Sequence, residues 1–133
     1  MSAVLIDTHV WAWTLHASGK LSTTARHAIE TAEVVYVSPA SFFEIGQKVR
    51  VGKWPQMVPF VDELPGLLAR QGALSAALDA KVCLRAGLMA WDHRDPFDRL
   101  LASTSLETDV PLVSADTAFD ALSTTPGWWP RIW

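Results

Sequence analysis

The sequence predicts an α/β fold in which a parallel sheet is sandwiched by helices. Three short apolar runs are typical of strands, at residues 3–6, 34–37 and 110–113, and each run is continuous rather than alternating. Continuous runs favour strands that are buried on both faces. Stretches with helical periodicity separate the runs, and strands that alternate with helices indicate a parallel sheet. Half of the residues are hydrophobic and no repeat or linker interrupts the chain, so one domain is expected over residues 1–133.

Helical patterns fill the spaces between the predicted strands. The predicted helices cover residues 8–17, 22–32, 39 to about 52, 60–72, 75–90, and a segment that begins at 96. Ser22 and Ser38 stand at helix starts, where a serine side chain caps the first turn. Pro65 and Gly66 must kink or divide the fourth helix. Residues 72–78 match a strand poorly.

Composition and charge limit the possible functions. The formal net charge of −3 excludes a global basic field, so a nucleic acid would need a local basic patch. The single cysteine, Cys83, cannot form an internal disulfide and is expected to be buried and inert, which indicates a reducing compartment. No apolar run reaches the roughly 18 residues of a membrane span, and Asp7 interrupts the first run. We therefore expect a soluble, cytoplasmic protein.

Carboxylates are concentrated where the predicted strands end. Asp7 directly follows the first strand, Glu44 lies within the helix after the second, and Asp116 follows the last. Asp95 and Asp98 open the final helix. In open α/β sheets the ligand site lies beyond the carboxyl ends of the strands, so these side chains are expected to meet at one edge.

Each acid also has a purely structural explanation. Asp7, Asp95 and Asp116 suit helix N-caps. Asp98 suits the positive end of a helix dipole, and Glu44 suits a solvated helix position. Carboxylates at one edge, however, repel each other by roughly 1 kcal/mol per pair at about 4 Å in water, and by about 4 kcal/mol at an effective dielectric constant near 20. A fold gathers them mainly where cations neutralise them, which favours a metal site.

The chemistry that such a site supports is phosphodiester hydrolysis. Carboxylate oxygens are the ligands that Mg²⁺ and Mn²⁺ prefer. These cations lower the pKa of a bound water, orient it for attack and stabilise charge on the leaving oxygen. The chain lacks the Walker loop, the GxGxxG pattern and the GxSxG elbow of other nucleotide-binding and hydrolase sites. The acids therefore predict metal-assisted hydrolysis of a phosphodiester.

Four segments resemble the successive motifs of PIN-domain ribonucleases, in particular the VapC-type toxins of bacterial type II toxin–antitoxin pairs. The segments are LIDTHVWAW (5–13), VSPASFFEIGQK (37–48), HRDPFDRLLASTS (93–105) and LVSAD (112–116). The resemblance extends over residues 4–120 and is specific because the four motifs keep their order and spacing. The catalytic residues and metal ligands that it implies are Asp7, Glu44, Asp98 and Asp116. Asp98 is preferred over Asp95 because the family's third acid opens the DRLLAS run, which leaves Asp95 as the helix cap.

The resemblance also implies a function and partners. It implies a metal-dependent endoribonuclease of PIN-like fold that cleaves single-stranded or structured RNA as the toxin of a toxin–antitoxin pair. Mg²⁺ is the implied cofactor, with Mn²⁺ as an alternative, and the implied partners are RNA, a cognate antitoxin and a second copy of the chain.

Two other functions stay open from the sequence. A PIN-like domain that only binds RNA or a partner fits the same motifs. A receiver-like signalling domain would need paired acids at the first strand and a late lysine, whereas LIDTH contains one acid and no lysine follows Lys81.

Polar and basic side chains near the acids are candidates for binding the substrate. They are Thr8, Ser38, Lys48, Arg94, Arg99 and Ser114. The hydroxyl groups stand at strand ends, where capping of a helix or turn is the ordinary alternative. The basic side chains would supply the phosphate contacts that the net charge does not, although many surface charges are simply solvated.

Histidines and tryptophans near the motifs are interpreted as structural. His9 and His93 stand beside carboxylates and are expected to be hydrogen-bonded groups outside the catalytic set. Trp11 and Trp13 are able to stack on bases, but core packing is the preferred interpretation. An apolar patch that a partner covers is predicted by the last three tryptophans, Trp128, Trp129 and Trp133.

Overall fold

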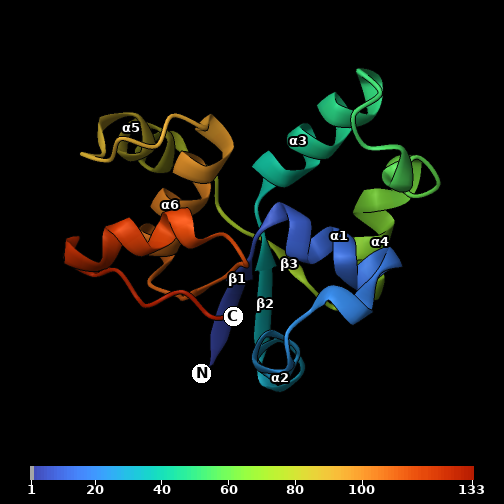
Figure 1. Cartoon of the computed structure of the whole chain (residues 1–133), viewed down its shortest axis with the longest axis horizontal. Coiled ribbons are helices and arrows are strands. Elements are labelled where there is room, and N and C mark those ends of the chain that lie inside the picture. Colours follow the sequence, from blue (N-terminus) through green and yellow to red (C-terminus); the bar gives the residue numbers. More distant parts are fainter. Residues whose placement is uncertain (1) are drawn as a thin grey trace.

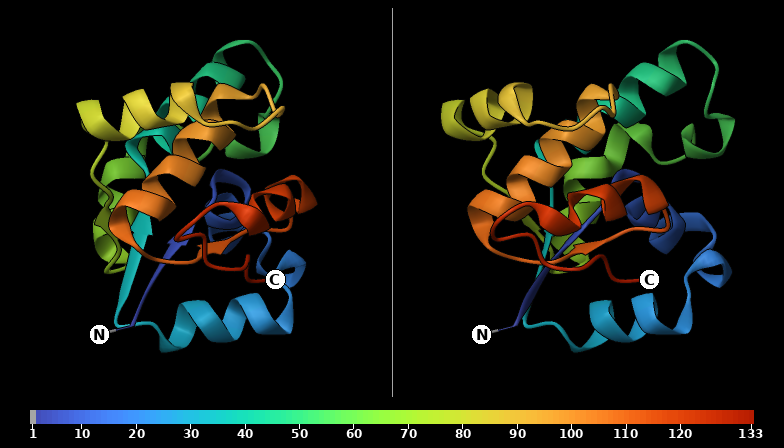
Figure 2. Two further views of the ribbon diagram at one scale, coloured as in Figure 1. Left: turned by 90° about the vertical axis from the view of Figure 1, so that its left-hand side faces the viewer. Right: turned by 60° about the vertical axis from the view of Figure 1, so that its left-hand side comes forward.

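The computed structural model describes residues 2–133, which form a four-stranded sheet with helices on both faces (Figure 1, Figure 2). The strands are β1 (Ala3–Ile6), β2 (Val34–Val37), β3 (Leu74–Ser75) and β4 (Leu112–Val113), in the order β3-β2-β1-β4. All neighbouring strands are parallel, which confirms the predicted α/β architecture.

The helices follow the predicted alternation with strands. The α-helices are α1 (Thr8–His16), α2 (Thr23–Thr31), α3 (Pro39–Arg50), α4 (Leu64–Arg70), α5 (Ala80–Leu88) and α6 (Pro96–Thr108), and the 3₁₀ helices are η1 (Ser18–Lys20), η2 (Pro55–Met57), η3 (Val61–Glu63) and η4 (Thr117–Thr124). Ser22 and Ser38 cap α2 and α3 through their hydroxyl oxygens, as predicted. Within residues 2–133, no helix has both the length and the apolar character needed to cross a membrane.

Strand β1 lies in the interior of the sheet and is buried on both faces, as its continuous apolar pattern predicts. Val4 and Ile6 belong to one hydrophobic cluster, which α1 to α4 complete from one side. Leu5, between them, belongs to a second cluster that α6 and η4 complete from the other side. Successive side chains of a strand point to opposite faces, so one short strand joins both halves of the core. Asp7, the next residue, is thereby held at the carboxyl edge between the two layers.

The segment between α4 and α5 differs from the prediction. Leu74 and Ser75 form β3 and pair with Tyr36 and Val37, although the sequence of residues 72–78 matches a strand poorly. The predicted helix over 75–90 is correspondingly shorter, because α5 begins only after the N-cap Asp79. A two-residue edge strand is determined by the strand it pairs with rather than by its own residues, and it therefore leaves little signal in the sequence.

Cys83 is exposed, and the prediction of a buried thiol is wrong. The buried residues of α5 are Val82 and Ala86, which are four apart and share the face that meets the core. Cys83, one position after Val82, is turned away from that face. The apolar composition around it was misleading because only one side of α5 is covered.

The final segment packs on the body of the protein. Ile132 donates a backbone hydrogen bond to Leu112, in β4. Trp128 packs beside Phe119, and the rings of Trp133 and Trp13 lie 5.8 Å apart. Intramolecular packing therefore covers two of the three tryptophans that were predicted to await a partner. Trp129 alone is largely exposed, at 50%.

Candidate active site

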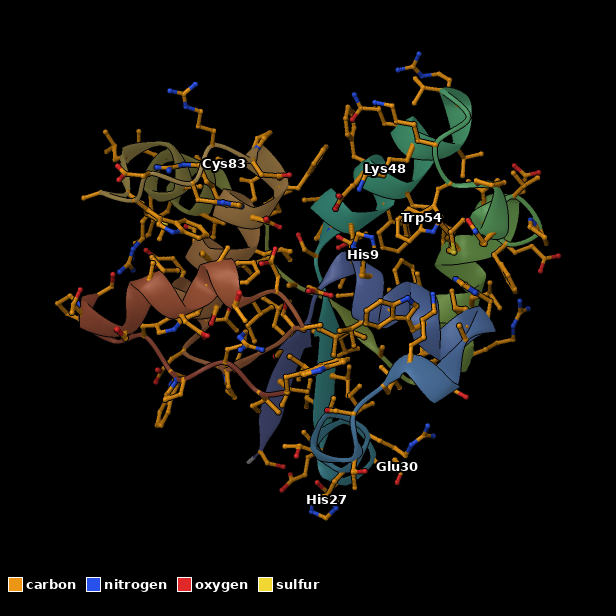
Figure 3. The ribbon with its side chains drawn as sticks, in the orientation of Figure 1. His9, His27, Glu30, Lys48, Trp54 and Cys83 are labelled. Carbon is orange, nitrogen blue, oxygen red and sulfur yellow. The ribbon has the colours of Figure 1, made fainter. Side chains whose placement is uncertain are left out.

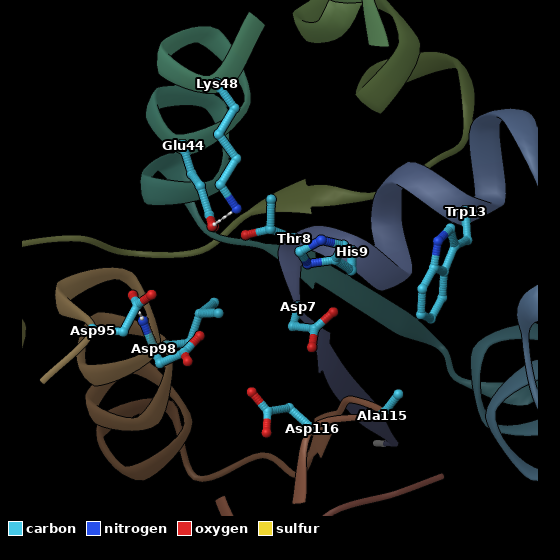
Figure 4. A pocket seen from close by; sticks show the side chains of 11 residues that line it. Asp7, Thr8, His9, Trp13, Glu44, Lys48, Asp95, Asp98, Ala115 and Asp116 are labelled. Carbon is cyan, nitrogen blue, oxygen red and sulfur yellow. Dashed lines mark hydrogen bonds and ion pairs between the residues drawn. The ribbon is translucent and has the colours of Figure 1, made fainter. Parts of the chain in front are cut away.

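All four predicted acids line one pocket of about 330 Å³ at the carboxyl edge of the sheet (Figure 4). The acids that line it are Asp7, Glu44, Asp98 and Asp116, together with Asp95. They come from the end of β1, from α3, from the start of α6 and from the turn after β4. These residues are far apart in the chain, but they meet beyond the carboxyl ends of the strands, as expected for an open α/β sheet.

Asp7 is a buried acid that caps α1 and has a raised pKa. Its Oδ1 accepts a hydrogen bond of 2.8 Å from the backbone N–H of Val10, and the residue is 8% exposed. Burial raises its pKa to about 6, and the charges of Asp98 and Glu44 act in the same direction. Hydrogen bonds from the Ser114 side chain and from Val10 oppose the rise without cancelling it. Asp7 therefore caps α1 and also faces the pocket, because α1 begins at the pocket.

Glu44 is 6% exposed, so the interpretation of a solvated helix position is wrong. Ser38 and Pro39 start α3 at the end of β2, and Glu44 lies in the second turn, facing the pocket. Its Oε2 accepts a hydrogen bond of 2.8 Å from Nζ of Lys48, one turn later in the same helix (Figure 4). A buried carboxylate needs a compensating cation, and in this structure Lys48 supplies it.

The two aspartates of the DPFD motif make different contacts, and the predicted capping role of Asp95 is confirmed. Oδ1 of Asp95 accepts from the backbone N–H groups of Phe97 and Asp98, which makes Asp95 the N-cap of α6. Asp98 instead has its Oδ2 2.7 Å from Nε2 of His93. Burial raises the pKa of Asp98, and the hydrogen bond with His93 opposes that rise.

Asp116 completes the acidic wall at the end of β4. Its Oδ1 accepts from the backbone N–H of Ala118 and caps η4. Its own N–H donates to the hydroxyl oxygen of Ser114. The capping role that the sequence allowed for Asp116 is therefore real, and the exposed residue also faces the pocket.

The acids share a pocket, and their chemistry fits a hard divalent cation. Among residues 2–133, no three His, Cys, Asp or Glu side chains meet closely enough to form a ready metal cluster. The donors are nevertheless all carboxylate oxygens, and burial raises the pKa of both Asp7 and Asp98. Burial is the main cause of both shifts, and the charges of neighbouring acids act in the same direction. Mg²⁺ and Mn²⁺ prefer such a donor set, so the residues present fit the cation that the sequence implied.

The predicted substrate-binding residues fall into two groups. Thr8 and Lys48 line the pocket, and Arg94 is an exposed residue beside Asp95. Ser38 and Ser114 are completely buried and accept backbone hydrogen bonds, so the capping alternative holds for both.

Arg99 does not have a guanidinium free for substrate. It donates hydrogen bonds to the backbone carbonyl groups of five residues, which are Ala86, Gly87, Met89, Trp91 and His93. The side chain therefore fixes the segment between α5 and α6, including the residue that contacts Asp98. The prediction that Arg99 contacts the substrate is therefore wrong, and Arg99 instead positions this segment.

Replacing Arg99 tests that role. We expect Arg99→Ala to lower the free energy of unfolding by about 2–4 kcal/mol, because several carbonyl groups lose a charged donor at once. Arg94→Ala, which removes an exposed arginine from the same motif, is expected to stay within about 0.5 kcal/mol of wild type. Urea unfolding of the three proteins makes the comparison. Equal stability of the two variants would show that the segment between α5 and α6 keeps its conformation without the hydrogen bonds from Arg99.

Two aromatic residues that were interpreted as structural from the sequence, His9 and Trp13, line the pocket. His9 is exposed and stacks on Trp54, with ring centroids 4.8 Å apart, rather than forming the expected structural hydrogen bond with a carboxylate. Although the residue is exposed overall, partial desolvation of its ring and the charge of Lys48 lower the pKa of His9, which favours a neutral ring. Trp13 also lines the pocket, whereas Trp11 is fully buried as predicted. The position of His9 two residues after the first acid was the available signal.

Comparisons with known proteins agree with this fold and identify the family. The model of the PIN domain family matches residues 4–124. Ribonuclease VapC22 of Mycobacterium tuberculosis (strain ATCC 25618 / H37Rv) is 28% identical over 119 residues, which cover 87% of this chain and 88% of that protein. The crystal structure of VapBC2 from Rickettsia felis, bound to a DNA fragment from the promoter, contains a chain similar in fold, with a TM-score of 0.65 and 13% identity over 98% of both chains.

Proposed function

This chain belongs to the PIN domain family, and from that membership we propose that it is a metal-dependent endoribonuclease that acts as the toxin of a toxin–antitoxin pair. The observation that carries the proposal is the convergence of Asp7, Glu44, Asp98 and Asp116, from four separate segments, on one pocket. The similarity to a protein named Ribonuclease VapC22 supports RNA as the substrate.

The four acids would hold Mg²⁺ or Mn²⁺ in this pocket. When bound, such a cation lowers the pKa of a water molecule and stabilises the charge that develops on the leaving oxygen. The protein's own contribution is to position the acids. The cap contact with Val10 fixes the carboxylate of Asp7, and His93 fixes the carboxylate of Asp98. Because the pKa of Asp7 is about 6, the proton competes with a cation for this carboxylate in mildly acidic solution.

Lys48 has a second role in the proposed site. It lies against the buried Glu44 and also lines the pocket, so its ammonium group is within the region where a substrate phosphate would approach. A cation at this place attracts the phosphodiester. The hydroxyl group of Thr8, held 2.9 Å from that of Ser41, is a further polar contact at the pocket wall.

The direct test is cleavage of single-stranded RNA by the purified protein. We expect cleavage in Mg²⁺ or Mn²⁺, complete loss in EDTA, and recovery when excess cation is returned. RNA that is bound but left intact under all three conditions would instead support the alternative of a PIN-like domain that only binds RNA. Gel analysis of end-labelled RNA distinguishes internal cuts from trimming at an end.

The partners belong to the same proposal. A cognate antitoxin would occlude the acidic pocket, and an arginine is the side chain best suited to pair with its carboxylates. A second copy of the chain would cover exposed apolar side chains on α3 and α5, which are Phe43, Leu84 and Leu88. A cytoplasmic location is part of the proposal, because the proposed RNA substrate and antitoxin would be met there.

A further inference from the structure

A second pocket of about 370 Å³ adjoins the acidic one and has the opposite character. It shares His9, Trp13 and Lys48 with the acidic pocket. Its further lining includes Lys20, Lys53 and Trp54, and no aspartate or glutamate lines it. We call these six residues the basic aromatic pocket. In Figure 4, His9 lies between the acids and Trp13, so the two pockets meet at the His9 ring.

The aromatic rings of this pocket form a supported platform. The rings of His9 and Trp54 stack with an interplanar angle of 30°, and the His9 and Trp13 centroids are 6.0 Å apart (Figure 3). Trp54 is buried in the core cluster, whereas His9 is exposed. A buried indole thus fixes the orientation of an exposed ring at the mouth of the acidic site. Exposed, oriented aromatic rings are the surfaces on which proteins stack single-stranded bases.

The lysines give the same pocket a local positive charge. Nζ of Lys48 lies 5.3 Å from the centroid of the Trp54 ring, and Nζ of Lys20 lies 5.8 Å from that of Trp13. Lys48 pairs with Glu44, but within residues 2–133 no carboxylate lies within ion-pair distance of Lys20 or Lys53. These two exposed ammonium groups are available to a polyanion, although the formal net charge of the chain is −3.

We propose that the basic aromatic pocket is the subsite for a nucleotide that flanks the scissile phosphate of single-stranded RNA. The base stacks on the His9 ring, and the adjoining phosphate contacts Lys53 and Lys20. The inference rests on the proposed ribonuclease function and specifies its substrate. A base within a duplex is already stacked between its neighbours, so this arrangement selects an unpaired strand.

The charge contribution is tested by RNA binding in EDTA, which prevents cation-dependent cleavage. We expect Lys53→Ala to weaken binding of a fluorescent single-stranded RNA about fivefold and to reduce the slope of log K against log salt by about 0.7, the value for one lost phosphate contact. Lys81→Ala is the matched control, because it removes one exposed lysine from α5, outside both pockets. Equal affinities and slopes for the two variants would overturn the proposal.

The stacking contribution is tested with RNAs that carry one abasic nucleotide at successive positions. We expect His9→Ala to weaken binding of intact RNA about tenfold and His9→Phe to restore most of it. The His9→Ala defect should disappear for one abasic position only. A defect that is the same on every abasic RNA would overturn the nucleotide subsite and leave a general cationic patch.

The two proposals fail in distinguishable ways. A wild-type protein that cleaves RNA, with no effect of Lys53→Ala or His9→Ala on binding, retains the nuclease function and loses the subsite. A wild-type protein that never cleaves RNA, but shows the position-specific His9 effect, retains the subsite and loses the nuclease function.

Discussion

Asp98→Asn is expected to lower the rate of RNA cleavage in Mg²⁺ by at least about a thousandfold, whereas Asp95→Asn should keep the rate within about threefold of wild type. The two aspartates lie three residues apart but use their oxygens differently. Asp95 accepts two backbone N–H groups at the start of α6, and the amide oxygen of asparagine accepts them equally well. Asp98 faces the pocket, where an amide is a weaker ligand for a hard cation than a carboxylate.

The measurement is the initial rate on one RNA at saturating Mg²⁺, for both variants and wild type. Each variant removes one negative charge from the same helical turn, so Asp95→Asn controls for the general change in electrostatic potential. If Asp95→Asn lost as much activity as Asp98→Asn, the assignment of Asp98 as the third acid of the site would be wrong.

Asp7→Asn is expected to make the cation-free protein more stable than wild type at pH 7–8, by about 3 kcal/mol. The pKa of Asp7 rises from 3.8 to about 6 in the folded protein, so the native state binds this proton more tightly than the unfolded state. The contribution of Asp7 to stability is therefore present at low pH and is lost as the pH rises from about 4 to about 6. Asparagine carries no charge to bury and still caps α1, so the stability of the variant does not fall in this pH range because of residue 7.

Urea unfolding in EDTA between pH 4 and pH 8 measures the effect. The two proteins should converge near pH 4 and separate above pH 6. Added Mg²⁺ should then stabilise wild type more than Asp7→Asn, because a ligand of the native state raises its stability. Asp79→Asn is the matched control, since Asp79 also caps a helix through a backbone N–H but lies outside the acidic pocket. A lower unfolding midpoint for Asp7→Asn than for wild type at pH 8 would mean that the ionised Asp7 carboxylate does not destabilise the folded protein.

The sequence was sufficient for features that depend on local patterns. The apolar run at 3–6 predicted β1, because burial on both faces leaves no polar position. Asp95 was recognised as a cap because capping depends only on adjacent residues. Asp7 and Asp116 were found because strand ends converge in every parallel sheet of this type.

Features that depend on distant contacts were not predictable in the same way. Whether Glu44 is solvated depends on how α3 packs against the rest of the protein, and the sequence of α3 alone does not contain that information. Arg99 has the composition of a surface cation, but the loop that it holds is positioned by α5 and α6 together. The stack of His9 on Trp54 joins residues from two separate segments with no shared motif.

Because β1 lies between β2 and β4 in the sheet, the acidic pocket is completed only late in the synthesis of the chain. β1 precedes β4 in the chain and is therefore synthesised before it, although the two strands are neighbours in the sheet, and Asp116 is made after β4. A nascent chain on the ribosome therefore carries Asp7 without the last wall of the acidic pocket. Contacts between such distant residues also form slowly, since a long loop must close first. We therefore expect the proposed ribonuclease to stay inactive on the ribosome that makes it until synthesis has passed residue 116.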